Sequence, residues 1–233
     1  MVMTGKLFLV SVPIGNKKDI TMRALECLSD VDYIICEELK PARRLLSEYK
    51  IQKELIPLNE HNEVETVPEV ITLLKEGNNL ALISDAGTPL FSDPGKFLVK
   101  QCIDLNIELS PLPGANSILP ALITSGFDIN SFYYYGWLSP KKDLRLNELL
   151  KLKSIKETIV IMETPYRLKS ILADVKKIFG DNARIALAYK LTMPEETVFR
   201  GTVKNILGKI EKLNLKGEFV LIIDNKIKHS KRI

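Results

Sequence analysis

The polar residues best placed to do chemistry follow short apolar runs. The segment 84–89 (SDAGTP) comes directly after the apolar run at 79–84. Its small residues let the backbone approach a flat polar ligand closely, and the Asp85 carboxylate can accept a hydrogen bond from an amine or hydroxyl. A capped turn without a ligand is the alternative. We expect ligand contact at this turn, and we expect Asp93 to cap a helix that Pro94 opens.

Two further turns follow apolar runs. The segment 12–16 (VPIGN) is neither a GxGxxG loop nor a phosphate-binding GKS/T loop, so the usual dinucleotide and nucleotide-triphosphate fingerprints are absent. By itself it is typical of a tight turn at Gly15. In the segment 112–117 (LPGANS) a strand ends and a helix begins, and the free N–H groups of a helix start can hold a polar ligand. A helix cap and a ligand site both remain open there.

The polar string at 60–63 (EHNE) lies after another short extended run. His61 or a neighbouring carboxylate could accept a proton at the rim of a sheet. Glu63 could equally open the next helix, with Asn62 as its cap. Both interpretations stay open.

Basic residues gather in two places. Lys40, Arg43 and Arg44 fall near the start of an expected helix, and Lys141 and Lys142 follow an aromatic run. Arginine and lysine contact phosphates, and aromatic rings stack on bases. On composition alone, solvated helix faces and core aromatics explain both groups more simply. The same holds for Trp137 and Arg145 nearby, and the three consecutive tyrosines at 133–135 cannot all point to one face of a strand.

Strands and helices alternate along the first half. Strands are expected at 6–12, 32–36, 54–58, 79–84 and 107–111, and helices at 21–28, 41–49, 63–75 and 94–105. This alternation predicts an α/β fold with a parallel sheet covered by helices. Since ligands of such sheets bind beyond the carboxyl ends of the strands, the turns described above are where a site is expected.

The second half contains more strands of hairpin type. Helices are expected at 115–124, 144–152, 166–179 and 203–213, and strands at 132–137, 158–162, 183–189, 197–201 and 217–224. This pattern predicts a mixed sheet. We place the boundary near Leu112, which gives an N-terminal α/β domain at 1–112 and a C-terminal α/β domain at 113–233.

Composition excludes several classes of protein. The 233 residues carry a net charge of +4, which permits a polyanionic partner without requiring one. Three cysteines in no zinc-binding pattern and only two histidines predict reduced thiols and no metal cofactor. No signal peptide and no apolar stretch long enough to span a membrane are visible, so we expect a cytoplasmic protein without membrane contact.

Together, the loops resemble those of the bacterial small-subunit (16S) ribosomal RNA 2′-O-methyltransferases of the cytidine-specific I type. These enzymes belong to the tetrapyrrole (corrin/porphyrin) methylase superfamily. The resemblance extends from about Lys6 to Asp224, and SDAGTP with the later DPG is its most specific part. The strings that carry it are VPIGN at 12–16, DIT at 19–21, RALECL at 23–28, HNE at 61–63, SDAGTPLFSDPG at 84–95, PLPG at 111–114, GWLSPKK at 136–142, ETPYRL at 163–168, KLT at 190–192, EET at 195–197 and KGEFVLII at 216–223.

The resemblance implies a two-domain class III methyltransferase fold that works as a homodimer, with S-adenosylmethionine in the cleft between the domains. It implies transfer of the methyl group to a cytidine 2′-hydroxyl in ribosomal RNA or the 30S subunit. The segment 216–218 is expected to close over the cofactor. By match of position, the cofactor contacts are expected at Pro13, Asp85, Ala86, Gly87, Thr88, Ser117, Met162 and Leu191.

Residues for catalysis and RNA binding follow from chemistry and the same resemblance. A 2′-hydroxyl benefits from a base that takes its proton. The candidates for this base are Glu37, Glu38, His61, Glu63 and Asp85. The candidate RNA contacts are Arg43, Arg44, Lys141, Lys142 and Arg167.

One segment departs from the family pattern. Where relatives read EDTR after the second strand, this chain has EELK at 37–40. Lysine cannot make the planar two-point contact of arginine, so the segment bears on which nucleotide is bound. Two alternatives therefore stay open: a paralogue that methylates a tetrapyrrole or another substrate, and a non-catalytic binder of RNA or cofactor.

Overall fold

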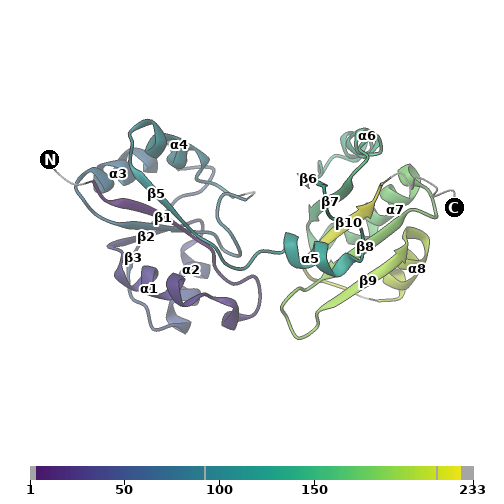
Figure 1. Ribbon diagram of the computed structural model, residues 1–233, viewed down its shortest axis with the longest axis horizontal. Coiled ribbons are helices and arrows are strands. Elements are labelled where there is room, and N and C mark those ends of the chain that lie inside the picture. The colour runs from purple at the N-terminus through teal and green to yellow at the C-terminus, as the bar shows by residue number, and fades with distance from the viewer. Residues whose placement is uncertain (1–3, 92, 214, 227–233) are drawn as a thin grey trace. The chain divides into compact units, whose positions relative to one another are not determined.

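The computed structural model describes residues 4–91, 93–213 and 215–226. The contacts divide the chain into two compact units, one that ends at Asn116 and one that begins at Ser117 (Figure 1). Leu112, near which the sequence predicted the boundary, is the last residue of a strand in the first unit. The turn at 113–116 belongs to the first unit. The carbonyl of Ala115 in this turn accepts a hydrogen bond from the Thr88 hydroxyl, which lies in another turn of the same unit.

The first unit is built on a five-stranded sheet in the order β3-β2-β4-β1-β5. All its pairings are parallel, as predicted. All five carboxyl ends consequently lie at one edge, from which the functional turns emerge. The strands are β1 (Lys6–Val10), β2 (Tyr33–Cys36), β3 (Glu54–Pro57), β4 (Leu80–Ile83) and β5 (Glu108–Leu112).

Two pairs of helices cover the two faces of this sheet (Figure 1). One apolar cluster joins α1 and α2 to the sheet through Leu28 and Leu46, and a second joins α3 and α4 through Leu74 and Leu98. The helices are α1 (Met22–Asp30), α2 (Leu39–Glu48), α3 (Glu63–Lys75) and α4 (Lys96–Asp104), with a short 3-10 helix η1 (Lys17–Asp19).

The second unit has a mixed five-stranded sheet in the order β6-β7-β10-β8-β9. Only β6 and β7 run parallel, which confirms the mixed sheet that the sequence predicted. Phe219 pairs with both Glu163 and Tyr189, so the ends of β7 and β8 meet the start of β10 at one edge. The strands are β6 (Phe132–Trp137), β7 (Thr158–Glu163), β8 (Arg184–Tyr189), β9 (Thr197–Thr202) and β10 (Phe219–Asp224).

Helices again lie on both faces of the second sheet. Three of them bury their apolar residues in one cluster with alternate residues of the strands, while α5 contacts β8, β9 and β10. Ala186 and Ala188 alternate with the clustered residues of β8 and let α5 approach closely. The helices are α5 (Ile118–Ser125), α6 (Lys142–Leu152), α7 (Leu168–Phe179) and α8 (Val203–Lys212), with a 3-10 helix η2 (Pro165–Arg167).

A register shift interrupts the simple alternation of faces in the tyrosine run on β6. Tyr133 is 42% exposed, whereas Tyr135 packs against the large apolar cluster. The register shifts between Tyr134 and Gly136, and Gly136 takes a φ of +86°. No helix in the part of the chain described here has the length and apolar character to cross a bilayer.

Replacing Leu172 by alanine should destabilise the second unit. Leu172 lies on α7 and is fully buried, so the substitution should lower the free energy of unfolding by about 2–5 kcal/mol. Trp137 is the only tryptophan and belongs to this unit, so its fluorescence during urea unfolding reports the change. Leu150→Ala is the control, because Leu150 is 53% exposed on α6. Equal midpoints for the two variants would contradict the assigned core.

Candidate functional site

The turns after β1 and β4 are joined by the main chain. The N–H of Val12 donates to the carbonyl of Gly87 at 2.9 Å, and the N–H of Gly87 donates to the carbonyl of Val12 at 3.1 Å. Gly87 has a φ of +82°, and a Cβ there would lie 3.2 Å from Cγ2 of Ile14. Glycine is therefore required at this crossing. The bridge brings Pro13, which is buried, beside the turn that contains Asp85.

The turn after β5 is fastened to the same pair. The hydroxyls of Ser11 and Thr88 are 3.0 Å apart, and the Thr88 hydroxyl donates to the carbonyl of Ala115 at 3.4 Å. A Cβ on Gly114 would lie 2.8 Å from that of Ser11, so the two backbones can approach only because Gly114 has no side chain. The three turns thus form one hydrogen-bonded rim at the carboxyl edge of the first sheet.

Carboxyl groups collect beside this rim. Burial, followed by the charge of Asp85, raises the pKa of Asp93 to about 6, and a hydrogen bond with Ser84 opposes the shift. Burial is also the main cause that raises the pKa of Glu37, with Asp85 and Asp93 adding to it. Burial raises the pKa of Asp85 as well, against the hydrogen bond that it accepts from the main-chain N–H of Glu38. This acidic rim suits a cationic ligand or one rich in hydrogen-bond donors.

The prediction that Asp93 caps α4 was wrong. The helix begins at Lys96, and Gly95, with a φ of +107°, is its N-terminal cap residue. Oε1 of Glu63 accepts hydrogen bonds from the N–H groups of Gly95 and Phe97, both at 3.0 Å. Because the chain turns at Gly95, the helix begins later than the sequence predicted. The Glu63 carboxylate of α3 accepts the hydrogen bonds of N–H groups that have no partner within the helix.

Glu63 and His61 therefore have different surroundings from the other proposed bases. The Glu63 carboxylate accepts hydrogen bonds at the start of α4. Glu63 is also the first residue of α3, which confirms one of the two interpretations of the sequence. The His61 side chain is 86% exposed, and its Nε2 lies 3.6 Å from Oε1 of Glu60. Glu37, Glu38 and Asp85 are the candidates that the structure brings together. The catalytic role of every candidate stays a prediction.

Expected cofactor residues of the second unit lie at one edge of its sheet. The Tyr134 hydroxyl donates to Sδ of Met162 at 3.2 Å near the end of β7. Leu191, which is 8% exposed, follows β8. The neighbouring Lys190 N–H donates to the carbonyl of Glu218 at 2.9 Å, so the segment 216–218 lies beside Leu191. Ser117 is the cap residue of α5 and makes no side-chain cap bond.

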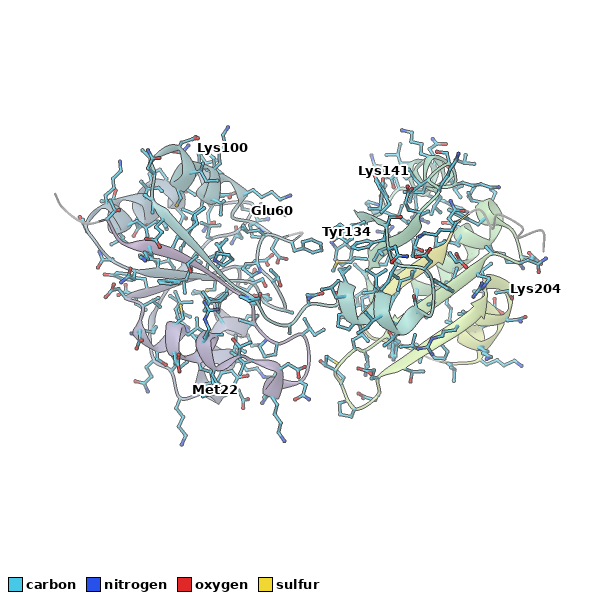
Figure 2. The ribbon with its side chains drawn as sticks, viewed as in Figure 1. Met22, Glu60, Lys100, Tyr134, Lys141 and Lys204 are labelled. Carbon is cyan, nitrogen blue, oxygen red and sulfur yellow. The ribbon has the colours of Figure 1, made fainter. Side chains whose placement is uncertain are left out.

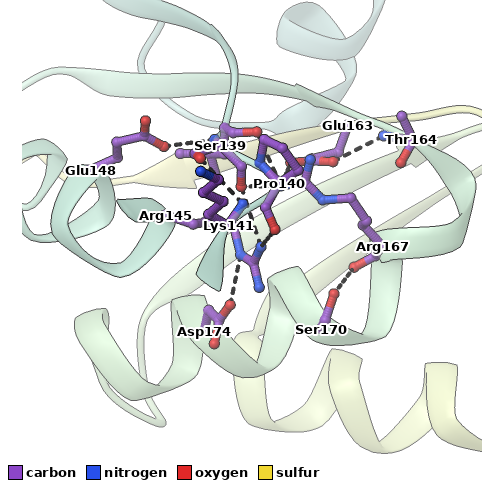
Figure 3. Close-up of polar contacts among 11 residues, drawn as sticks. Ser139, Pro140, Lys141, Arg145, Glu148, Glu163, Thr164, Arg167, Ser170 and Asp174 are labelled. Atoms are coloured by element: carbon purple, nitrogen blue, oxygen red, sulfur yellow. Dashed lines mark hydrogen bonds and ion pairs between the residues drawn. The ribbon is translucent and has the colours of Figure 1, made fainter. Parts of the chain in front are cut away.

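Sequence reasoning missed a buried ionic network after β6 (Figure 3). Nε of Arg145 donates to Oδ2 of Asp174 at 2.8 Å, and both side chains are less than a tenth exposed. The Arg145 guanidinium also donates to the carbonyls of Ser139 and Pro140, at 3.3 and 3.1 Å. Arg145 was grouped in the sequence with exposed basic residues, but its burial gives it a structural role. No regular spacing links it to Asp174, so the sequence contains no signal for the pair.

Arg167 holds the same turn from the other side. Its Nη2 donates to the carbonyls of Leu138 and Ser139, at 3.1 and 2.8 Å, and lies 2.9 Å from Oε1 of the buried Glu163. An RNA contact by Arg167 stays a prediction, although these donors already have protein partners. Lys141 and Lys142 follow the turn and are exposed at the start of α6, where Figure 2 labels Lys141.

The described residues contain no group of three or more histidine, cysteine, aspartate or glutamate side chains arranged to hold a metal ion. Of the three cysteines, Cys36 and Cys102 are buried, and burial raises the pKa of each thiol to about 11. Both are protonated at neutral pH and are poor nucleophiles.

Replacing one member of the buried Arg145–Asp174 pair should destabilise the second unit more than replacing both members. Arg145→Met leaves the Asp174 carboxylate buried and unpaired, which should cost about 3–5 kcal/mol of unfolding free energy. The double variant Arg145→Met/Asp174→Leu should recover most of that loss. Urea unfolding followed by Trp137 fluorescence measures both. A double variant that is no more stable than the single one would contradict the pairing.

Asp93 should titrate near neutrality. Its carboxyl carbon, followed by NMR, should show a midpoint near pH 6, and Asp85→Asn should lower that midpoint, because one repelling charge is removed. Since burial is the larger cause, the midpoint should stay above 3.8. The folded state holds this proton more tightly than the unfolded state, so the carboxyl lowers the stability of the first unit as pH rises from about 4 to about 6. A wild-type midpoint near 3.8 would contradict the buried acidic rim.

Three bacterial proteins that share one name are similar in sequence to this chain along nearly its whole length. The chain is 40% identical over 220 residues to the "Ribosomal RNA small subunit methyltransferase I" of Bacillus subtilis, which covers 94% of this chain and 75% of the relative. The protein of the same name from Haemophilus influenzae is 40% identical over 228 residues and covers 97% and 81%. That of Thermotoga maritima is 39% identical over 222 residues and covers 95% and 99%.

Solved structures show the same fold at low identity. A cobalt precorrin-4 methyltransferase superposes with a TM-score of 0.67 at 16% identity and covers 94% of each chain. A uroporphyrin-III-C-methyltransferase from Thermus thermophilus gives 0.63 at 22% identity and covers 95% of this chain and 94% of its own. The profile of the Tetrapyrrole (Corrin/Porphyrin) Methylases matches residues 6–207. Since that profile matches most of the chain, and relatives near 40% identity cover more than nine tenths of it, the chain belongs to the tetrapyrrole (corrin/porphyrin) methylase family.

Proposed function

We propose that the chain is an S-adenosylmethionine-dependent methyltransferase that methylates the ribose 2′-hydroxyl of a cytidine in small-subunit ribosomal RNA. Its membership of the family supports methyl transfer, and the names of relatives near 40% identity support the RNA substrate. The observation that carries the proposal is the rim where Val12 and Gly87 exchange two main-chain hydrogen bonds beside Asp85. Those relatives cover nearly the whole chain.

The residues at the rim fit the proposed methyl donor chemically. S-adenosylmethionine brings an activated methyl group on a sulfonium, together with hydroxyl and amino groups. Asp85 is partly desolvated by its neighbours but still reaches solvent, so its carboxylate can accept from such donors. The tight crossing at Gly87 keeps side chains away from the main chain. We propose Pro13, Asp85, Ala86, Gly87 and Thr88 as donor contacts at the rim of the first unit. For the second unit, the resemblance to the family proposes Ser117, Met162 and Leu191 as donor contacts.

The carboxyl groups of Glu37, Glu38 and Asp85 lie close together and are the candidates that would take the proton of the ribose 2′-hydroxyl, the methyl acceptor. In the proposed reaction the ribose oxygen attacks the methyl carbon, the carbon–sulfur bond breaks, and a carboxylate takes the hydroxyl proton. Holding the two substrates in line supplies much of the rate, because the donor is already activated. Glu37 is the base we favour, since its burial and its neighbours raise its pKa and make it a better proton acceptor than an exposed glutamate.

RNA binding is assigned to exposed cations. Arg43 and Arg44 lie exposed on α2, which begins directly after the EELK segment, and Lys141 and Lys142 lie exposed at the start of α6. These side chains can contact phosphates without reading sequence. A homodimer and a cytoplasmic location complete the proposal.

A transfer assay tests the proposal. The wild-type chain should transfer labelled methyl groups from S-adenosylmethionine to small ribosomal subunits from a strain that lacks this gene, and mass mapping should find the product on a cytidine ribose. Asp85→Asn should weaken donor binding about 10- to 100-fold, because a hydrogen bond to a charged group contributes about 1.5–3 kcal/mol. Calorimetry measures that binding, and Asp104→Asn, an exposed position on α4, is the matched control.

Three results would contradict parts of the proposal. Transfer to a porphyrinoid but not to ribosomal RNA would make the chain a paralogue with another substrate. Donor binding without transfer to any ribosomal particle would make it a non-catalytic binder. Unchanged donor affinity in Asp85→Asn would remove the assigned donor site.

A further inference from the structure

A groove lies on the flank of the first unit, between the end of α2 and the start of β3. It has a volume of about 660 Å³. Because β3 is an edge strand and begins there, the groove lies toward the amino edge of the sheet, away from the rim of joined turns. Its lining residues are Arg43, Leu46, Ser47, Lys50, Ile51, Gln52, Lys53, Glu54 and Leu55.

The charges of the groove favour an anion. Arg43, Lys50 and Lys53 are opposed by a single carboxylate, that of Glu54. None of these three cations forms an ion pair within the residues that the structure describes. The nearby Lys17, by contrast, is paired with a carboxylate of α2. Three cations without partners remain available to a ligand.

The positive surface continues along α2 toward the rim. Lys40 and Arg44 are exposed on the same helix as Arg43 and likewise form no ion pair among the described residues. Residues three and four apart share one helix face, so positions 40, 43, 44 and 47 are neighbours. The helix starts just after Glu37 and Glu38, and its 10 residues extend about 15 Å. A strip of five cations thus connects the acidic rim with the groove.

The chemistry of the strip fits a sugar–phosphate backbone better than bases. The groove has an apolar floor of Leu46, Ile51 and Leu55 but no aromatic ring on which a base could stack. Contacts of this kind position a nucleic acid without reading its sequence.

We propose that this groove, with Lys40 and Arg44, binds the ribose–phosphate backbone of ribosomal RNA to one side of the nucleotide that is methylated. This inference rests on the proposed function. The strip would hold the RNA so that the target nucleotide reaches the rim, and it would contribute to RNA affinity and not to the chemical step.

Salt dependence of RNA binding tests the groove. The triple variant Arg43→Gln/Lys50→Gln/Lys53→Gln should reduce the slope of log affinity for small ribosomal subunits against log salt by about three, one for each lost phosphate contact. The KM for the subunit should rise, while kcat at saturation and the calorimetric Kd for S-adenosylmethionine should stay as in the wild type. Filter binding over a salt series measures the slope.

A control variant removes the same charge elsewhere. Lys75→Gln/Lys100→Gln/Lys151→Gln changes three exposed lysines, and Figure 2 labels Lys100 on α4, on the sheet face opposite α2. Equal slopes for the two triple variants, or a groove variant with the wild-type slope, would overturn the proposed groove even if methylation occurs. A wild-type chain that binds the subunit with a steep, groove-dependent slope but transfers no methyl group would contradict the proposed function and leave the groove supported.

Discussion

The pair of main-chain hydrogen bonds between Val12 and Gly87 is the constraint on which the candidate site depends. They connect turns that follow two neighbouring parallel strands, and they can form only because Gly87 adopts a positive φ. The Thr88 hydroxyl contacts that of Ser11 and donates to the carbonyl of Ala115, which fastens the third turn to the same point. The position of Asp85 relative to Pro13 is therefore fixed by backbone geometry and not by flexible side chains.

The second unit fixes its own turn by burying charges. An ion pair removed from water costs a desolvation free energy that the attraction between its charges only partly offsets, so such pairs add specificity more readily than stability. Nη1 of Arg145 and Nη2 of Arg167 each donate to two carbonyls of the turn 138–140, and Asp174 and Glu163 balance the charges of the two guanidinium groups. The turn is held in one conformation while the cations after it remain at the surface.

The sequence predicted much of the fold, because local patterns determined it. Alternating apolar runs and helical spacings gave the parallel first sheet and the mixed second one, and α3 begins and ends where the spacing of Val64 through Leu74 indicated. The cap of α4 was mispredicted because its acceptor is Glu63, on another helix. The Arg145–Asp174 pair was missed for the same reason: both contacts depend on tertiary approach, which no periodicity encodes.

The carbonyls of the turn 138–140 all accept hydrogen bonds from Arg145 or Arg167, and this affects which surface residues of the enzyme can be replaced without moving the turn. Arg145 and Arg167 bind that backbone from within. The main-chain N–H of Lys141 donates to the Ser139 hydroxyl at 3.3 Å, whereas the side chains of Lys141 and Lys142 are exposed. Mutations at these two positions can alter the surface chemistry presented to a partner while the supporting scaffold keeps its shape. The fold of this turn and the chemistry of the surface beside it can therefore change independently.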